Sequence, residues 1–295
     1  MKKSTIFKFF LTILLFAVLV IKVNFYEILS IIFSLNIFYL IGALSLVPVL
    51  YVIRTGRWNM FLHSFGINLP FIQSFKIILI GNFYGLITPG KVGELGRAYH
   101  LNEKKVLTIP TIIMEKMIDI FTLIILSLLT IIFYFQKSTF MQGGIFLCSI
   151  AVIISIFLLT NKKAVYFIAK LFNINQENSE QFTENLQELL QNYLVIGYAF
   201  LLSLVYYLVA YLLGYLIILA AGFNPIVLIT LPIIVLMGNI PITISGLGLR
   251  ESIGSLSFIY LGDTAANGFV FAFLLFFLIT VIPGIFGYIL TIKEN

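Results

Sequence analysis

The sequence predicts an all-α, polytopic membrane protein with two re-entrant hairpins that are related as an inverted repeat. Its 295 residues are 61% hydrophobic and only 10% charged, whereas soluble domains carry about 25% charged residues. The apolar runs are long enough to cross a bilayer as helices, which takes about 20 residues each, and they lack the alternation of barrel strands. Two glycine-rich segments interrupt these runs and approach the membrane from opposite sides.

The N-terminal end predicts the orientation of the chain. Three lysines open the sequence: Lys2, Lys3 and Lys8. Because basic residues collect on the cytoplasmic side, we expect a multi-pass protein of the plasma membrane with a cytoplasmic N-terminus. No small-residue cleavage site follows residues 5–22, which are therefore expected to form an uncleaved first helix. Residues 28–53 are expected to form a second helix that returns the chain to a cytoplasmic loop containing Arg54 and Arg57.

The apolar stretch 71–89 is expected to form the first re-entrant hairpin, within about residues 70–97. Cations flank this stretch on both sides: Arg54, Arg57, Lys91, Arg97, Lys104 and Lys105. Both of its ends are therefore predicted to be cytoplasmic, which a single span cannot achieve. Pro89 and Gly90 interrupt the helix, and non-helical backbone at membrane depth is tolerated only against protein or a water-filled cavity. We expect the hairpin to line such a cavity.

Four further spanning helices are expected at residues 107–135, 143–160, 194–221 and 268–291. A hydrophilic cytoplasmic segment, about 161–192, separates the second of these from the third. Its apolar residues fall at helical spacing: Phe182, Leu186, Leu189, Leu190 and Tyr193. This spacing predicts an amphipathic surface helix. The whole chain, residues 1–295, is expected to be one integral membrane domain.

Residues 226–262 are predicted to form the second re-entrant hairpin, with both ends outside. The broken parts of the two hairpins have similar sequences, "GNFYGLITPGKVGELGR" from Gly81 and "GNIPITISGLGLRE" from Gly238. Both begin with Gly-Asn, place Ile-Thr before a glycine-rich break and end with a glutamate and an arginine. Paired broken segments that enter from opposite sides indicate a transporter binding site near the bilayer midplane.

Polar residues at these breaks are the predicted substrate-binding residues. They are a threonine, a glutamate and an arginine in each hairpin: Thr88, Glu94, Arg97, Thr243, Arg250 and Glu251. The breaks themselves are assigned to Pro89, Gly90, Gly93, Gly246 and Gly248. A charge deep in the bilayer costs about 2.5–3.5 kcal/mol, so these charges are either paired or hydrated there, or lie at the interface as helix-end charges. Because arginine binds two phosphate oxygens at once and helix N-termini favour anions, the pattern predicts a site for a phosphate-bearing lipid head.

The stretch "MEKMIDI" predicts a third polar cluster. Glu115 and Asp119 are four residues apart and share a helix face, and Lys116 can pair with Asp119. Charged residues inside an apolar helix are functional candidates. We assign these three residues to substrate binding, with the alternative that the two acids are counter-charges for Arg97 or Arg250.

Other classes of function are not supported by the sequence. Residues 85–91 have the spacing of a phosphate-binding loop, but Val92 stands where a Ser or Thr must hold magnesium, and no strand precedes the loop. Cys148 is the only cysteine, so we expect no internal disulfide and no metal or redox motif. The net charge of +6 is assigned to loop cations and not to nucleic-acid binding. We predict no cofactor, no metal and no catalytic residues.

Three motifs follow one another over about residues 70–290. The first has a proline, glycines, an acid and an arginine: Pro89, Gly90, Gly93, Glu94, Arg97, Ala98 and Leu101. The second is "MEKMIDI", and the third is "ITISGLGLRES" with Gly246, Gly248, Arg250 and Glu251. In this order they resemble the lysylphosphatidylglycerol synthase transmembrane family, also called flippase-like domain proteins. Lys116 replaces the arginine that is usual in the family's Glu-Arg-x-x-Asp motif.

This resemblance implies an integral membrane module that translocates lipids. In the best-known members it flips aminoacylated phosphatidylglycerol, which an attached soluble synthase domain makes. Other members are linked with lipid-borne sugars, hopanoids or polyprenyl phosphates. We therefore expect a flippase or transporter that moves an anionic or aminoacylated phospholipid, or a lipid-linked intermediate, between leaflets.

The expected partners are the membrane lipid, a separate lipid-modifying enzyme or glycosyltransferase, and further copies of the chain. The sequence ends at Asn295 directly after its last predicted helix, without room for a synthase domain, so we expect no enzymatic activity. Two alternatives stay open: a membrane-embedded lipid-modifying transferase and an accessory scaffold subunit.

Overall fold

The fold is helical throughout the part of the chain that the structure describes. This computed structural model describes residues 12, 14, 16–101, 103–134 and 176–294, and within these residues there is no strand. Predicted features that lie wholly or partly outside the described residues include the N-terminal lysines, the first helix at 5–22, the helix at 143–160, Cys148 and the start of the hydrophilic segment.

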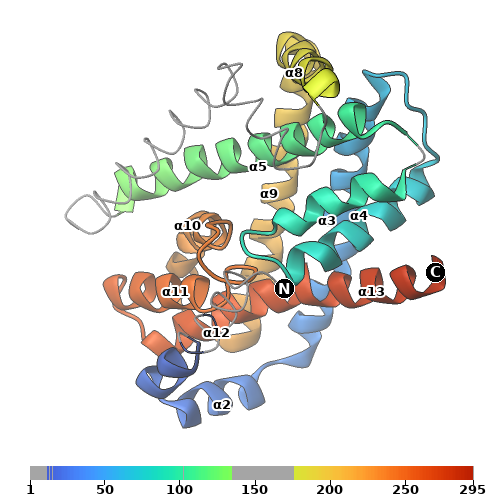
Figure 1. The fold of residues 1–295 in the computed structure, drawn as a ribbon. Coiled ribbons are helices and arrows are strands. Elements are labelled where there is room, and N and C mark those ends of the chain that lie inside the picture. Colours follow the sequence, from blue (N-terminus) through green and yellow to red (C-terminus); the bar gives the residue numbers. More distant parts are fainter. Residues whose placement is uncertain (1–11, 13, 15, 102, 135–175, 295) are drawn as a thin grey trace. The chain divides into compact units, whose positions relative to one another are not determined.

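The chain forms two compact units, each built from separate stretches of sequence. The colours of Figure 1 follow the residue numbers, so each stretch can be found along the ribbon. Unit 1 consists of Met1–Ile53, Phe75–Arg97 and Val205–Asn295, and unit 2 consists of Arg54–Ser74 and Ala98–Leu204. The polar features described below each lie within one of these units.

Within the described residues, four helices are long and apolar enough to span a membrane: α3 (Ile37–His63), α5 (Lys105–Tyr134), α9 (Tyr193–Ala221) and the run Ala265–Lys293. The last run is divided into α12 (Ala265–Phe276), the short helix η3 (Phe277–Val281) and α13 (Ile282–Glu294). Each has 27 to 30 residues, which is about 40–45 Å of helix and more than the hydrocarbon thickness of about 30 Å. The prediction of a multi-span helical membrane protein is therefore confirmed, and the last three of these helices lie within a few residues of their predicted positions.

The predicted second helix, 28–53, is wrong in its boundaries. The chain turns by 81° between helix Phe16–Val23 and α2 (Phe25–Ser34), and α3 begins only at Ile37. Two asparagines cause these interruptions, because their side chains accept the backbone N–H two residues later, in Asn24–Tyr26 and Asn36–Phe38. Such side-chain caps start new helices.

The C-terminal end of α3 also differs from the prediction. Arg54 and Arg57, which we assigned to a cytoplasmic loop, lie inside α3, because this helix continues to His63. Both arginines are buried. Their positive charges are therefore part of the folded core of unit 2, and the loop assignment is wrong.

Among the described residues, two apolar helices that border irregular segments are too short to cross a bilayer. α4 (Phe71–Leu86) leads into the 3₁₀-helix η1 (Val92–His100). The second segment begins with η2 (Pro225–Thr230) and α10 (Leu231–Met237) and ends with α11 (Leu249–Tyr260). The 16 residues of α4 reach about 24 Å and the 12 residues of α11 about 18 Å. Both irregular segments coincide with the breaks expected from the sequence.

At two prolines of the long helices, side chains from other elements donate to the backbone carbonyls near the missing N–H. In α5, Pro110 has no N–H for the carbonyl of Val106, four residues earlier. Asn185 Nδ2 donates to that carbonyl at 2.8 Å. Because no water reaches such a group in an apolar interior, the replacement donor is needed.

The same arrangement occurs near the C-terminus, in unit 1. Pro283 follows the π-helical turn η3, where helical hydrogen bonds are already irregular. The hydroxyl of Tyr51 donates to the carbonyl of Ile279 at 3.0 Å, and Asn82 Nδ2 donates to the carbonyl of Thr280 at 2.8 Å. Side chains of α3 and α4 thereby hold the last helix at its weakest turn.

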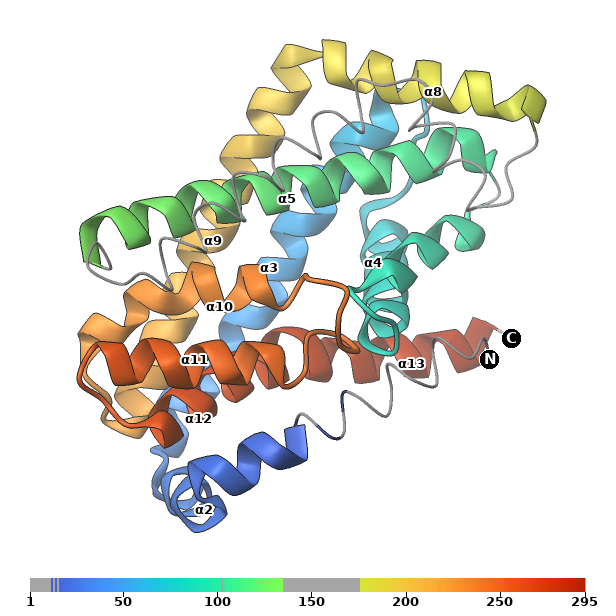
Figure 2. The ribbon, with the colours of Figure 1, turned by 60° about the vertical axis from the view of Figure 1, so that its left-hand side comes forward.

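Glycines bring helices of unit 1 into close contact. A Cβ on Gly287 of α13 would collide with the carbonyl oxygen of Leu79 in α4. Gly254 of α11 and Gly268 of α12 pack backbone to backbone in the same way, where these two helices run side by side (Figure 2). Small residues allow this close approach in membrane proteins, where apolar burial does not drive helix association.

The amphipathic helix predicted in the hydrophilic segment is confirmed as α8 (Gln176–Gln191), which lies beside α5 in unit 2 (Figure 2). Phe182, Leu186 and Leu189 are fully buried, as their spacing predicted. Tyr193 differs, because it begins α9 and is 79% exposed.

Candidate functional site

The first break folds its charged residues back against α4. A Cβ on Gly81 would lie 3.0 Å from Cδ of Arg97, and a Cβ on Gly85 would lie 2.7 Å from Cγ of Glu94. Both charged side chains are buried, with residue exposures of 0% and 2%. The two glycines therefore provide the room in which the acid and the arginine of this break lie.

Thr88 organises the turn itself. Its hydroxyl accepts the N–H of Gly93 at 2.7 Å and donates to the carbonyl of Tyr84 at 2.9 Å. Gly90 and Lys91 adopt positive φ angles of 58° and 56°, which close the turn. A side chain at Gly93 would collide with the Tyr84 carbonyl, so this position requires glycine.

The second break buries its arginine in a similar way. A Cβ on Gly238 would lie 2.8 Å from Cδ of Arg250. The guanidinium donates through Nη2 to the carbonyl of Ser245 at 2.7 Å, and it lies 3.8 Å from the ring centre of Phe276. In both breaks, the glycine of the Gly-Asn pair thus packs against the arginine that follows the break.

Glu251 caps the helix that leaves the second break. Its Oε2 accepts the N–H of Gly248 at 2.7 Å, at the start of α11. Gly246 and Gly248 have φ angles of 76° and 84°, and a side chain at Gly246 would collide with Gly238. The carboxylate is fully buried.

Four buried polar atoms of this break have no hydrogen-bond partner among the described residues. They are Thr243 Oγ1, Ser245 Oγ, Arg250 Nε and Glu251 Oε1. We call these four residues the break site. Buried polar groups are normally satisfied, and a cluster of exceptions requires an explanation. This cluster offers donors and an acceptor within nine residues of sequence.

The tips of the two breaks meet inside unit 1. Pro89 and Ile244 form an antiparallel bridge, and the N–H of Ser245 donates to the carbonyl of Thr88 at 3.2 Å. A Cβ on Gly90 would lie 2.6 Å from Cβ of Pro241. Segments about 150 residues apart in sequence are therefore in backbone contact where each one is non-helical.

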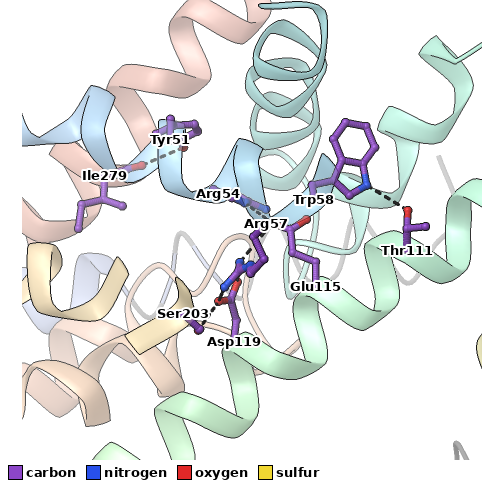
Figure 3. A network of polar contacts seen from close by, with 9 residues as sticks. All are labelled: Tyr51, Arg54, Arg57, Trp58, Thr111, Glu115, Asp119, Ser203 and Ile279. Carbon is purple, nitrogen blue, oxygen red and sulfur yellow. Dashed lines mark hydrogen bonds and ion pairs between the residues drawn. The ribbon is translucent and has the colours of Figure 1, made fainter. Parts of the chain in front are cut away.

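The third predicted cluster lies in unit 2, where α5 meets the end of α3 (Figure 3). Arg57 binds Asp119 with two hydrogen bonds, from Nη1 to Oδ1 at 2.5 Å and from Nη2 to Oδ2 at 2.8 Å. Glu115 Oε1 accepts from Arg54 Nε at 2.9 Å and from Arg57 Nη2 at 3.3 Å. We call these four residues the α3–α5 cluster, and its formal charges cancel. Lys116 lies on α5 between the two acids, half-buried.

Neighbouring side chains complete this region. Ser203 of α9 donates through its hydroxyl to Asp119 Oδ1 at 3.1 Å, and Trp58 Nε1 donates to Thr111 Oγ1 at 3.0 Å (Figure 3). The acids of "MEKMIDI" thus pair with Arg54 and Arg57, two arginines that the sequence did not suggest as their partners. The missed signal is the i, i+3 spacing of the two arginines, which places both on one helix face.

The two polar regions have chemistry in common. A guanidinium presents its N–H groups in a planar fork that matches carboxylate or phosphate. In the α3–α5 cluster a carboxylate fills the fork of Arg57. At the break site, one buried edge of Arg250 is not filled by any described residue.

Comparison with known proteins agrees with this architecture. A family model described as the lysylphosphatidylglycerol synthase TM region matches residues 5–287. The UPF0104 membrane protein MJ1595 of Methanocaldococcus jannaschii is 28% identical over 173 residues, which are 52% of this chain and 51% of that protein. The chain thus spans about half the length of the curated relative that it matches. No solved structure matches the chain. The chain belongs to the lysylphosphatidylglycerol synthase TM region family.

Proposed function

We propose that this protein is a lipid transporter that moves a phosphate-bearing lipid head between leaflets past its two broken segments. The observation that carries the proposal is the break site, with four buried polar atoms that no described residue satisfies. It lies where two apolar segments lose their helical structure and touch. Unsatisfied polar atoms beside broken backbone are unfavourable in a lipid environment unless a polar ligand occupies them.

The proposal includes re-entrant topology and an inverted repeat. α4 and α11 are shorter than a bilayer core, which supports two hairpins that enter and return on one side. The contacts of Gly81 with Arg97 and of Gly238 with Arg250 support an internal repeat, since the same residue types pack together in the same order. Two such hairpins that enter from opposite faces meet at their tips near the midplane.

The chemistry of the break site favours a head that carries both acceptors and donors. Arg250 Nε requires an acceptor, such as a phosphate oxygen, and Glu251 Oε1 requires a donor, such as a hydroxyl or an ammonium group. Arg97 and Glu94 supply a second pair of the same types at the first break. The lipid tails remain in the bilayer while the head passes the tips.

We further propose that the chain does not synthesise the lipid that it moves, and that a separate lipid-modifying enzyme or glycosyltransferase supplies it. Its proposed location is the plasma membrane, with a cytoplasmic N-terminus. We do not assign a synthase activity to this chain from the family's description. Mass spectrometry of lipids incubated with the purified protein tests this point, and conversion of a headgroup would contradict it.

A leaflet assay tests the transport proposal. The protein is reconstituted into vesicles with fluorescently labelled phosphatidylglycerol, and dithionite quenches the label that reaches the outer leaflet. We expect wild-type protein to expose inner-leaflet label, and Thr243→Val and Ser245→Ala to slow this exposure. These hydroxyls have no partner in the described structure, so their removal is not expected to unfold the protein.

Ser127→Ala is the matched control, because Ser127 Oγ is also buried without a partner but lies in α5 of unit 2. Transport by Ser245→Ala and Thr243→Val at the wild-type rate would contradict the assignment of the break site.

A further inference from the structure

We infer that Arg57 is a second anion-binding residue, which binds the phosphodiester of a lipid headgroup. Without lipid, the carboxylate of Asp119 binds the guanidinium of Arg57 in its place, and the incoming lipid displaces this carboxylate. This inference goes beyond the proposed function, because it concerns unit 2 and a binding step that takes place without transport. It rests on the geometry, exposure and charge of the α3–α5 cluster.

The geometry of the pair is that of an anion held in an arginine fork. Each carboxylate oxygen of Asp119 accepts one hydrogen bond from Arg57: Oδ1 accepts from Nη1 at 2.5 Å and Oδ2 accepts from Nη2 at 2.8 Å. The two non-bridging oxygens of a phosphodiester fit the same fork. Arg57 Nε is buried and has no acceptor among the described residues, so the fully buried guanidinium keeps a donor that the carboxylate does not use.

The exposure of the cluster shows which anion can leave. The side chain of Asp119 is 18% exposed, whereas those of Arg57 and Glu115 are 1% and 0% exposed. Glu115 is held by two arginines at once. Asp119 is therefore the more accessible of the two anions in the cluster.

The charge balance selects the incoming ligand. With Asp119 withdrawn, Arg54 and Arg57 carry two positive charges and Glu115 carries one negative charge. The positive charge that remains among these three residues favours an anion, such as a phosphodiester, over a neutral ligand. A cation does not fit, because both oxygens of Asp119 already accept from Arg57 and a buried positive charge would lie behind it.

Ser203 provides the perturbation that tests the exchange. Its hydroxyl donates to Asp119 Oδ1 at 3.1 Å and so helps to keep the carboxylate in the fork, without carrying a charge. Ser203→Ala loosens Asp119 and leaves both arginines in place. If Asp119 competes with the ligand, this loss must increase the affinity for the ligand.

Trp58 allows the binding to be followed directly. It is the only tryptophan of the chain, it is buried, and it follows Arg57 in α3. Its fluorescence is recorded while full-length protein in neutral detergent is titrated with dioctanoyl-phosphatidylglycerol. Inorganic phosphate and dioctanoylglycerol are titrated in parallel, because they offer the anion without the lipid and the lipid without the anion.

We expect phosphatidylglycerol alone to give saturable binding at low concentration. Ser203→Ala should bind it about three- to fivefold more tightly, which is the effect of one hydrogen bond, and Asp119→Asn should bind it at least about tenfold more tightly because it removes the competing charge. Arg57→Lys should bind at least about tenfold more weakly, because it keeps the charge but loses the fork. Ser127→Ala, in α5 but outside both sites, should bind as wild type does.

The opposite results would overturn the inference. If the pair is only structural, Ser203→Ala binds no more tightly than Ser127→Ala. This comparison is valid even if Asp119→Asn does not fold. Equal binding of dioctanoylglycerol would reject an anion site, and equal binding of inorganic phosphate would reject a lipid ligand. Because the measurement is binding at equilibrium, failure of the transport assay does not affect it.

Discussion

The contact between Asn185 and the carbonyl of Val106 allows a quantitative prediction. Asn185→Leu keeps a similar side-chain volume but removes the donor that replaces the missing N–H of Pro110. All three residues are buried. An unsatisfied buried carbonyl costs about 1–3 kcal/mol, and side-chain hydrogen bonds in membrane proteins average about 0.6 kcal/mol with a maximum near 1.7. We expect the free energy of unfolding to fall by about 1–2 kcal/mol.

A second substitution makes the physical reason testable. Pro110→Ala restores a backbone N–H that donates to the Val106 carbonyl along α5. In that background Asn185→Leu should lower the free energy of unfolding by less than about 0.5 kcal/mol, since the carbonyl keeps a partner. The coupling between the two substitutions is therefore expected to be about 0.5–2 kcal/mol.

The assay is denaturant unfolding of the four proteins in detergent micelles, followed by circular dichroism. Gln181→Leu, an exposed position on the same helix α8, is the control and should change stability by less than about 0.5 kcal/mol. Asn185→Leu should lower the free energy of unfolding more in wild-type protein than in the Pro110→Ala variant. An equal loss would show that Asn185 does not compensate for the N–H that Pro110 lacks.

Three further predictions concern other contacts, each read from the free energy of unfolding. Arg57→Leu should lower it by about 3–5 kcal/mol because the buried Glu115 and the partly exposed Asp119 lose a partner. Adding Asp119→Leu should recover part of this loss, and no recovery would argue against the ion pair. Gly287→Val should lower the free energy of unfolding by more than about 2 kcal/mol, since the new Cβ collides with α4. Gly197 has open space around it, so Gly197→Ala should raise the free energy of unfolding by about 0.5–1 kcal/mol. Equal effects of the two substitutions would contradict the close packing at Gly287. Tyr51→Phe should lower it by about 1 kcal/mol through the lost bond to the π-helical turn, and no change would show that this bond is not needed.

Local sequence was sufficient for the long helices and for the positions of the breaks. α5, α9 and the C-terminal run match their predicted ranges because each is a long apolar stretch between polar residues. The breaks at Pro89 and Gly246 were visible because glycine and proline change backbone geometry wherever they stand. The amphipathic spacing of α8 was likewise a local signal.

The errors arose where distant contacts decide the structure. The chain separates α2 from α3 at Asn36, where the signal is one capping asparagine and no glycine or proline. Arg54 and Arg57 resemble loop cations until the acids of α5 are known to face them. The meeting of Pro89 with Ile244 depends on tertiary packing, so no local pattern predicts it.

The central claim is that the two break tips must separate for a lipid head to pass, and a reversible cross-link tests it most directly. Pro89 and Ile244 form a bridge pair with Cα atoms expected about 4.5–5.5 Å apart, within the range for a disulfide. Pro89→Cys and Ile244→Cys are combined with Cys148→Ser, and lipid transfer between leaflets is measured before oxidation, after oxidation and after reduction, with each single cysteine variant as control. We predict that oxidation stops transfer in the double variant alone and that reduction restores it. Transfer at an unchanged rate through cross-linked tips would contradict the account.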